Sequence, residues 1–301
     1  RRLTKRNNMD LPDDMFNEHG DIAWSGFTEF LAAFDKASAC IQTVEDYREV
    51  AYQYMVSCAQ EGAIYMEIFT SPIHAAEVDI DYGSHLEAIT RGLEDAEREF
   101  GIIGRLIVTC VRHRGPELAV ELAKTLAAEP HPYVVGFGMG GNEAMYSCAD
   151  FAPAFDIAAA TGIGCTIHAG EVCGPESVWD ALNNLPVTRI GHGVRSIEDP
   201  ELVAELSARG TVLEMCPGSN FALDIYKDAS AHPMLKFIAA GCKVTLGSDD
   251  PYFFNTTIGN EYEMASRDFG LSDNQLIQLT MNAIDGAFCD DETKTKLRSK
   301  L

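Results

Sequence analysis

Short runs of β-branched and other apolar residues alternate along the chain with longer segments in which apolar residues recur at helical spacing. This alternation is typical of βα units built around a parallel sheet. Seven runs have the length and composition of buried strands, and they cover 64–69, 105–111, 134–138, 164–168, 187–191, 211–215 and 243–248. The segments between them have helical periodicity at 45–61, 83–100, 115–128, 150–161, 175–183, 199–208 and 232–240. The pattern therefore predicts an α/β fold.

Local signals support several of these helix boundaries. Asp199-Pro200 is typical of a helix start, and Gly210 and Gly241 stand where glycine commonly ends a helix. Residues 256–301 are helical in pattern and are expected to close the outside of a barrel. No linker, short repeat or low-complexity segment divides the chain, so residues 1–301 are predicted to form a single domain.

The number of predicted strands leaves two architectures open. A TIM-type (β/α)8 barrel needs eight strands, whereas residues 1–63 look like helix and loop, and an extended stretch at 21–24 is too short to serve. Either the sheet is open, or the first strand lies upstream of residue 1. The second alternative, a (β/α)8 barrel truncated at its N-terminus, gains weight from the chemistry described below.

The balance of charge excludes two classes of partner. With 46 acidic and 23 basic residues, the chain carries a formal net charge of −23, which would repel both nucleic acid and an anionic membrane. The basic residues near the start are expected to form the solvated face of a helix, and they are Arg1, Arg2, Lys5 and Arg6. We therefore expect no nucleic acid and no membrane as a partner.

The cysteines indicate a reducing compartment. There are nine, an odd number, and no C-x-x-C pair occurs among them. Cys110, Cys165 and Cys242 lie in apolar stretches, where a free thiol behaves as a small hydrophobe. No apolar run reaches membrane-spanning length. These features favour a cytoplasmic protein over one held together by disulfides.

Three of the predicted strands end in polar residues of catalytic types. His168 closes one strand and Glu171 follows it, His192 directly follows the next strand, and Asp249 and Asp250 follow the last. Each residue alone has a structural explanation, such as a satisfied core histidine or an Asp-Pro loop opening. Because the carboxyl ends of barrel strands converge on one mouth, the three endings together indicate a site.

These residue types suit metal-assisted hydrolysis. Imidazole and carboxylate are ligands that catalytic zinc accepts, with one coordination position left open for water. Such a water ionises near neutral pH, and a further histidine and a glutamate beside it would handle protons.

Longer blocks around these residues resemble the signature sequences of the adenosine deaminase family, in the family's order. The blocks are Gly140-Gly-Asn-Glu143, similar to the family's Ala-Gly-Asp-Glu, then His168-Ala-Gly-Glu171, Arg189-Ile-Gly-His192-Gly193, Glu214-Met-Cys-Pro-Gly-Ser-Asn220, His232-Pro233 and Ser248-Asp-Asp-Pro251. The likeness covers the chain from about Phe27 onward. It implies a zinc-dependent hydrolase on a barrel, which deaminates a small purine nucleoside, adenosine or deoxyadenosine, to inosine or deoxyinosine plus ammonia.

The resemblance also implies a role for each matching residue. His168 and Asp249 would bind one Zn2+ ion, and His192 would orient or deprotonate the water that the metal activates. Glu171 would protonate purine N1 as the water attacks C6, and Asp250 would hydrogen-bond N7. A desolvated barrel mouth suits a carboxyl group that must carry a proton near neutral pH.

Two further features of the family touch the substrate's other sides. The backbone of Gly141 would approach purine N3, and a bare glycine backbone allows such a close approach to a flat ring. Phe30, Leu31 and Phe34 resemble the family's apolar lid, although they fit one face of an amphipathic helix equally well.

The sequence departs from the family pattern at one point. The family takes two further zinc ligands from a His-x-His on its first strand, and none of the eight histidines forms such a pair. The missing strand and the missing ligands both point upstream of residue 1, where we expect the two further His ligands. The remaining histidines are interpreted as surface or loop residues, and they are His19, His74, His85, His113 and His131.

Several alternatives stay open. Gly191 before His192 resembles the nucleoside enzymes, whereas free-base adenine deaminases tend to have an acidic residue there, so adenine or a modified adenine nucleoside is the second candidate substrate. A non-catalytic purine-binding barrel and a metal hydrolase outside the deaminases are two further alternatives, and Glu171 argues against the last. The G-x-G-x-x-G match at 136–141 lacks the acidic residue of a dinucleotide site. His85-Leu-Glu87 lacks the P-C-x-x-C of the other zinc deaminases, and His85 is expected to be solvated.

Overall fold

The computed structural model of the protein describes residues 2–9, 16–18, 20 and 22–301. Three sequence predictions fall wholly or partly on other residues and lie outside the described part of the chain: Arg1 of the basic cluster, His19, and the first residue of 21–24. No helix in the described part is long and apolar enough to cross a membrane.

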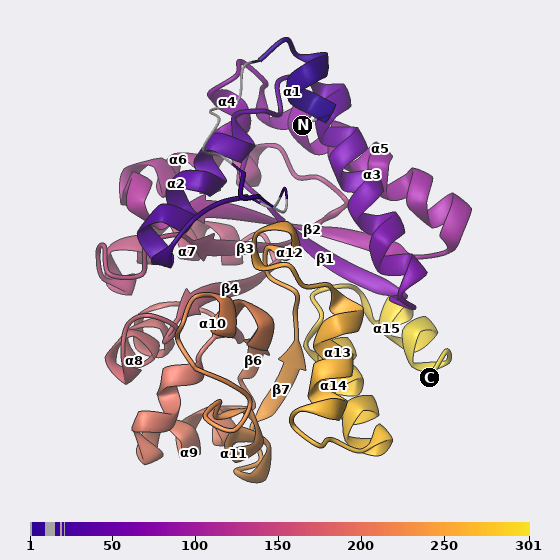
Figure 1. The fold of residues 1–301 in the computed structure, drawn as a ribbon. Coiled ribbons are helices and arrows are strands. Elements are labelled where there is room, and N and C mark those ends of the chain that lie inside the picture. The colour runs from indigo at the N-terminus through magenta and orange to yellow at the C-terminus, as the bar shows by residue number, and fades with distance from the viewer. Residues whose placement is uncertain (1, 10–15, 19, 21) are drawn as a thin grey trace.

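Seven parallel strands form one curled sheet in chain order, with helices packed around its outside (Figure 1). The strands are β1 (Tyr65–Thr70), β2 (Ile103–Val111), β3 (Val134–Gly140), β4 (Gly164–Ala169), β5 (Arg189–His192), β6 (Val212–Met215) and β7 (Lys243–Leu246). Each falls on a run that the apolar pattern predicts, with ends that differ by at most two residues. The α/β architecture of a TIM-type barrel is confirmed, and β1 and β7 are the sheet's edges among the described residues.

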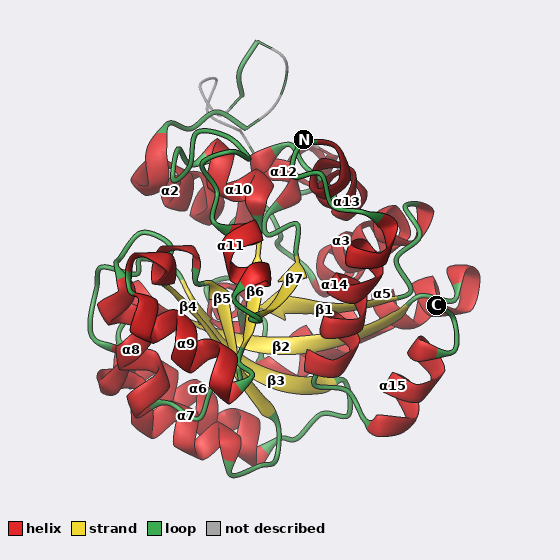
Figure 2. Ribbon diagram, turned by 90° about the horizontal axis from the view of Figure 1, so that it is seen from below, coloured by secondary structure: helices red, strands yellow, loops and turns green. Residues whose placement is uncertain are grey.

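The helices between the strands also follow the prediction, and Figure 2 shows them around the sheet from a second direction. They are α3 (Val44–Gln60), α5 (Tyr82–Phe100), α6 (Pro116–Ala128), α7 (Ala152–Ala159), α8 (Pro175–Asn184), α9 (Pro200–Arg209) and α11 (Met234–Ala239). The C-terminal region forms α13 (Ile258–Arg267), α14 (Asp273–Gly286) and α15 (Asp291–Arg298), as its helical pattern predicts. The predicted helix at 150–161 begins as the 3-10 turn η3 (Cys148–Phe151), and Pro153 lies in the first turn of α7, where its missing N–H costs nothing.

Side-chain caps set the ends of several helices. Thr43 and Asp46 form a capping box at the start of α3, in which each side chain accepts a hydrogen bond from the other's backbone N–H. Asp199 caps α9 by accepting from the N–H of Glu201 at 2.9 Å. Gly210 ends α9 in the left-handed conformation, at φ +67°, which glycine adopts without steric cost.

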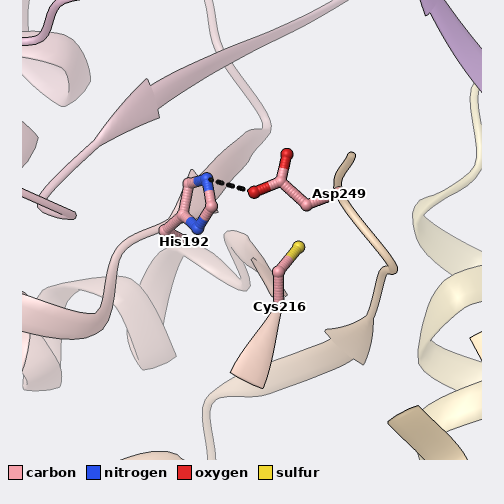
Figure 3. Close-up of side chains that lie close together, drawn as sticks. All are labelled: His192, Cys216 and Asp249. Carbon is pink, nitrogen blue, oxygen red and sulfur yellow. Dashed lines mark ion pairs between the residues drawn. The ribbon is translucent and has the colours of Figure 1, made fainter. Parts of the chain in front are cut away.

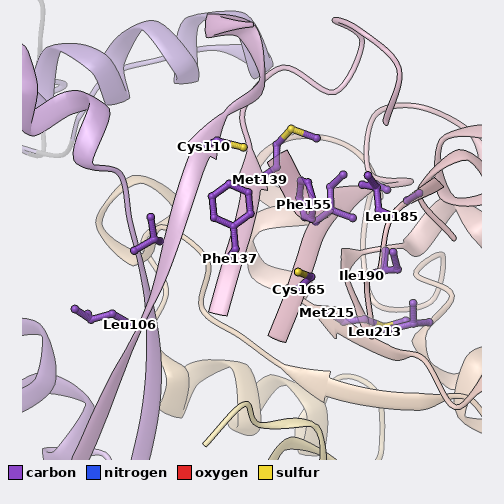
Figure 4. Packing of buried hydrophobic residues seen from close by; sticks show 14 of the residues in the cluster. Leu106, Cys110, Phe137, Met139, Phe155, Cys165, Leu185, Ile190, Leu213 and Met215 are labelled. Atoms are coloured by element: carbon purple, nitrogen blue, oxygen red, sulfur yellow. The ribbon is translucent and has the colours of Figure 1, made fainter. Parts of the chain in front are cut away.

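A continuous apolar core fills the space between the strands and the surrounding helices (Figure 4). Phe137 of β3 and Phe155 of α7 are fully buried, and their rings meet edge to face with centroids 5.1 Å apart. Burial of a side chain of this size contributes about 1.5–3 kcal/mol. Cys110, Cys165 and Cys242 are free thiols buried in the same core, as their apolar context predicts.

A buried ion network crosses the interior of the curled sheet. Arg189 of β5 donates to Glu67 of β1 at 2.6 Å and lies 2.9 Å from Glu214 of β6. Glu214 in turn accepts from the hydroxyl of Thr166 on β4 at 2.6 Å. The network therefore connects the edge strand β1 to the middle of the sheet. The pattern of apolar and polar residues in the sequence does not predict which of these groups pair.

The segment that follows α14 packs against the buried ion network. The backbone N–H of Phe288 donates to Glu67 at 2.7 Å, and the Arg189 guanidinium lies 3.5 Å from the centre of the Phe288 ring. A Cβ atom on Gly164 would lie 2.1 Å from that ring, so the strand can pass there only as glycine. The C-terminal region thus enters the barrel interior as well as covering its outside, which its helical pattern does not predict.

The basic residues near the start pack on α3. Helix α1 (Arg2–Arg6) is formed, and Arg6 makes ion pairs with both Asp46 and Glu49, while Arg2 pairs with Glu49. Asp46 is fully buried. The expectation of a solvated helix face is confirmed, because Arg2, Lys5 and Arg6 are exposed on α1, and the two arginines also pair with acidic residues of α3.

Replacement of Arg189 by leucine is expected to lower the free energy of unfolding by about 3–5 kcal/mol, because it leaves Glu67 and Glu214 buried without their cation. The matched control is Arg267→Leu, which removes an exposed arginine paired with Glu263 and Asp268 and should cost at most about 1 kcal/mol. Urea unfolding followed by circular dichroism measures both. Equal losses in the two variants would contradict a structural role for the buried network.

Candidate active site

The ends of β4 and β5 bring two histidines together. In the parallel register, His168 pairs with Gly191 and Ala169 pairs with His192. The imidazole rings of His168 and His192 meet edge to face, with centroids 4.9 Å apart. Two histidines that are distant in sequence therefore share one edge of the sheet, as the strand endings predict.

Glycines make room for the His168 ring. A Cβ atom on Gly191 would lie 2.6 Å from Cδ2 of His168, which is closer than real Cβ contacts come. A Cβ atom on Gly140 would lie 3.4 Å from its Cε1. Glycine is therefore required at position 191 by the packing of His168, whatever the substrate is.

The loop after β7 brings a carboxylate to the same place. Oδ2 of Asp249 lies 3.8 Å from Nε2 of His192, and Cys216 at the end of β6 completes a cluster whose ligand-type atoms all lie within 4.8 Å of one another (Figure 3). His192 and Asp249 both have left-handed backbone conformations, with φ of 60° and 52°. Such strained, non-glycine conformations are typical of functional sites.

The donor set at this edge fits zinc. His168 and Asp249 offer an imidazole and a carboxylate, which are both zinc ligands. Burial, followed by the charge of Asp249, raises the pKa of the Cys216 thiol well above its usual value.

Glu171 is a buried carboxyl group at the centre of the cluster. Its side chain is 6% exposed, and Oε1 lies 3.3 Å from Nδ1 of His192. Burial, and after it the charge of Asp249, raises the pKa of Glu171 to about 8. The group therefore carries a proton at neutral pH, as a general acid must.

Asp250 is the neighbour of Asp249 and begins α12 (Pro251–Phe254). Burial and the adjacent charge of Asp249 raise the pKa of Asp250 well above its usual value. Two adjacent acids in one dry site cannot both ionise freely. The site therefore favours the neutral form of Asp250.

Gly141 follows β3 at the same edge of the sheet. Its φ of +100° is a conformation that side chains rarely adopt, and a Cβ atom there would lie 2.8 Å from Nδ1 of His113. The Nδ1 atom also accepts from the N–H of Asn142 at 3.4 Å. Glycine is therefore required here on both backbone and packing grounds.

A second buried carboxylate, Glu143, holds the loop that carries Glu171. It is 5% exposed and accepts five hydrogen bonds. The donors are the backbone N–H groups of Gly170, Glu171 (3.1 Å), Val172 (2.8 Å) and Cys173 (2.9 Å), and the hydroxyl of Ser177 (2.5 Å). Buried Arg112 holds the neighbouring backbone by donating to the carbonyl of His168 at 3.0 Å. The sequence assigned no role to Glu143 or Arg112, although Glu143 stands in a signature block.

The aromatic residues of α2 (Gly26–Ser38) pack against the helix that follows Asp250. Phe30 lies 4.8 Å from Phe254 and 5.5 Å from Phe253, measured between ring centres. Trp24 joins them by donating from its indole N–H to the carbonyl of Phe253 at 3.1 Å. The apolar face predicted for this segment is therefore an aromatic cluster over α12.

One histidine prediction is wrong. His85 lies in α5 and is fully buried; Nε2 is 2.8 Å from the hydroxyl of Thr70, and its ring meets Tyr47 at 4.5 Å. Burial lowers the pKa of His85 to about 4. It is a neutral core histidine rather than a solvated one, and His74, with its side chain 10% exposed, is also largely buried.

The fold and the cluster define a class: a TIM-type α/β barrel whose strand ends present the residues of a metal-dependent hydrolase. The whole sequence, residues 1–301, matches the family described as adenosine deaminase. The chain belongs to the adenosine deaminase family, whose members are hydrolases acting on C–N bonds in cyclic amidines.

Individual relatives and structures agree with this assignment. An adenine deaminase of Rhizobium rhizogenes is 44% identical over 299 residues, which cover 99% of this chain and 93% of that protein. The adenine deaminase of Arthrobacter aurescens has a TM-score of 0.91 at 26% identity, with 99% of this chain and 91% of that one covered. An amidohydrolase of Burkholderia ambifaria with bound zinc gives 0.89 at 28% identity, with 99% and 83% covered. The N6-methyl-AMP deaminase of Arabidopsis thaliana gives 0.85 at 27% identity, with 99% and 88% covered.

Replacement of Glu143 by glutamine is expected to lower the free energy of unfolding by about 1–3 kcal/mol, because an amide NH2 group then faces backbone N–H donors. Activity should fall about tenfold as the Glu171 loop loosens. The control is Glu176→Gln in the first turn of α8, directly after this loop, an exposed residue that accepts one N–H, from Gly174 at 3.1 Å. Unchanged stability in Glu143→Gln would contradict the clamp.

The raised pKa of Glu171 predicts a pH dependence of stability. The unfolded state releases this proton near pH 4.3 and the folded state near pH 8, so between these values the folded state binds more protons. The free energy of unfolding should therefore fall as pH rises through this window, by up to about 1.4 kcal/mol per pH unit from this group. In Glu171→Gln that share of the slope should vanish.

Urea unfolding at pH 5, 6 and 7 measures the two slopes. Glu198→Gln is the control, because a hydrogen bond from Arg195 lowers the pKa of Glu198 and moves its titration below the window. A slope that is the same in the wild type and in Glu171→Gln would show that Glu171 is ionised in the folded protein.

Proposed function

We propose that the protein catalyses zinc-dependent hydrolytic deamination at C6 of a 6-aminopurine, with release of ammonia and formation of the 6-oxopurine. The observation that carries this proposal is the carboxyl group of Glu171, which is buried 3.3 Å from His192 with a pKa that burial raises to about 8. Hydrolysis of an amidine needs an acid for the ring nitrogen and an activated water for the carbon. The cluster offers groups for both tasks.

We propose adenine as the preferred substrate. The support comes from the relatives at 44% identity, which are named adenine deaminases, and from the Arthrobacter structure with the same name. The expectation of adenosine depended on Gly191, and the close approach of His168 explains this glycine without reference to a sugar. Adenosine remains the second candidate.

His168 and Asp249 would hold the zinc ion, with the two further histidine ligands that we propose upstream of residue 1. Zinc when bound supplies Lewis-acid chemistry, which makes water a nucleophile near neutral pH. Asp249 is held next to His192 by the left-handed turn after β7. This placement puts His192 beside a proposed zinc ligand, where it would orient the water that attacks C6.

The remaining roles follow from protonation and from shape. Glu171 would give its proton to N1, which prevents negative charge from building on the ring as C6 is attacked. Asp250 with its raised pKa would donate a hydrogen bond to N7. The backbone at Gly141 would meet N3, where the glycine leaves no side chain in the way.

The test is release of ammonia from adenine and adenosine, and of methylamine from N6-methyl-AMP, by the zinc-supplied protein with any chain segment that precedes residue 1. We expect the highest kcat/KM on adenine. Glu171→Gln, which preserves shape, should lose about 10²–10⁴-fold in kcat. The exposed Glu176→Gln should retain it, and unchanged zinc content would show that both variants keep the metal.

Each other result has a defined meaning. Preference for adenosine would assign the second candidate, and release of methylamine from N6-methyl-AMP would assign a modified nucleotide. Tight purine binding without any product would leave a purine-binding barrel and overturn the proposed activity.

A further inference from the structure

Asn220 connects the cluster to a histidine outside it. Asn220 lies in α10 (Pro217–Ala222) and is fully buried. Its Nδ2 atom lies 3.4 Å from Oε1 of Glu171 and 3.4 Å from Nδ1 of His192, and its Oδ1 atom lies 3.1 Å from Nε2 of His232. One amide therefore contacts both groups proposed to handle protons, and a third group behind them.

The backbone N–H of Met234 fixes which groups donate and which accept in these hydrogen bonds. The backbone N–H of Met234 meets Nδ1 of His232 at 3.2 Å, and a backbone N–H can only donate. Nδ1 is therefore the acceptor. Burial lowers the pKa of His232 to about 3, so the neutral ring carries its single proton on Nε2. That proton is donated to Oδ1 of Asn220.

The orientation of the Asn220 amide follows. Its oxygen faces His232, so both hydrogens of its NH2 group face the cluster. One is donated to Oε1 of Glu171 and the other to Nδ1 of His192. His192 then carries its proton on Nε2, the nitrogen that faces Asp249.

We propose that His232 and Asn220 are positioning residues that set the tautomer of His192 and orient the carboxyl group of Glu171. This inference rests on the proposed function for the role of that carboxyl group, whereas the tautomer of His192 can be tested without it. The chain of hydrogen bonds begins at the backbone N–H of Met234. It runs through His232 and Asn220 and ends at Glu171 and His192.

A purely structural role for His232 makes a different prediction. The ring is packed among Phe221, Tyr226 and Phe269, with centroid distances of 5.8, 5.1 and 5.5 Å, and it accepts the N–H at the start of α11. If packing and this cap were its only purposes, any substitution that keeps the cap would suffice. If it positions Asn220, the donor at the Nε2 place must be kept.

Two amide variants separate these roles. In His232→Gln the side-chain NH2 group reaches the place of Nε2 and can donate to Asn220. In His232→Asn the side-chain oxygen takes the place of Nδ1 and keeps the cap, but the side chain is too short to reach Asn220. Both variants lose the same ring, so they differ chiefly in the donor.

The measurements are kcat and KM on the best purine substrate, and ¹⁵N NMR of the histidine rings in the zinc-supplied protein, with the His192 signals assigned through a His192→Asn variant. We expect His192 to carry its proton on Nε2 in the wild type and in His232→Gln, and to show mixed tautomers in His232→Asn. We expect kcat within about threefold of wild type in His232→Gln and about 10–100-fold lower in His232→Asn, with KM changed less than threefold.

Asn220→Asp gives a second, nearly isosteric test that leaves His232 in place. It keeps the acceptor for His232 and removes both hydrogens, so it should lower kcat at least tenfold and shift the His192 tautomer. Equal kcat in His232→Gln and His232→Asn, or a wild-type His192 protonated on Nδ1, would overturn the proposal. Because the NMR result needs no turnover, it decides the positioning role even if the proposed deaminase activity fails.

Discussion

The arrangement of the whole site depends on the ion pair between Arg189 and Glu67. It connects β5 to the edge strand β1 across the interior, where the sheet must curl for its strand ends to face one another. The inward positions alternate along each strand, so Thr166 of this lower layer is followed by His168 of the site. Likewise Glu214 is followed two residues later by Cys216. A shift of the strands at Thr166 and Glu214 would therefore move the site residues two positions further along the same strands.

The site itself is governed by how each buried carboxyl group is satisfied. Glu143 accepts five hydrogen bonds, four of them from backbone N–H groups. Glu171 and Asp250 have few donors and a charged neighbour in Asp249, and their pKa values are raised. One residue type thus holds a loop in one environment and has a raised pKa in the other, because the number of donors differs.

The sequence predicts what depends on local pattern and on the ends of strands. Apolar runs place all seven strands, and the polar residues after β4, β5 and β7 meet because parallel strands end at one edge. The roles of Glu143 and Asn220 need tertiary contacts over 27 to 49 residues, which no spacing predicts. The path of Phe288 into the barrel is hidden for the same reason.

For His85, the helical periodicity of its segment is more informative than the segment's average composition. The segment is rich in charge, which favours a solvated helix, but His85 has the same face as Ile89, Leu93 and Ala96, all of them buried. Helical spacing of three to four residues would have placed it inside.

The chain separates the groups that act from the groups that orient them. The proposed ligands and proton-handling groups lie at the ends of β4, β5 and β7, whereas Asn220 and His232 belong to the segment after β6. A strand fixes the position of a histidine's backbone to a fraction of an ångström. It does not fix the rotation of the imidazole ring or which ring nitrogen carries the proton. A hydrogen bond that starts from a backbone N–H removes that choice, since the backbone group has only a proton to give. Rigid strands and a directed set of hydrogen bonds are therefore complementary parts of one site.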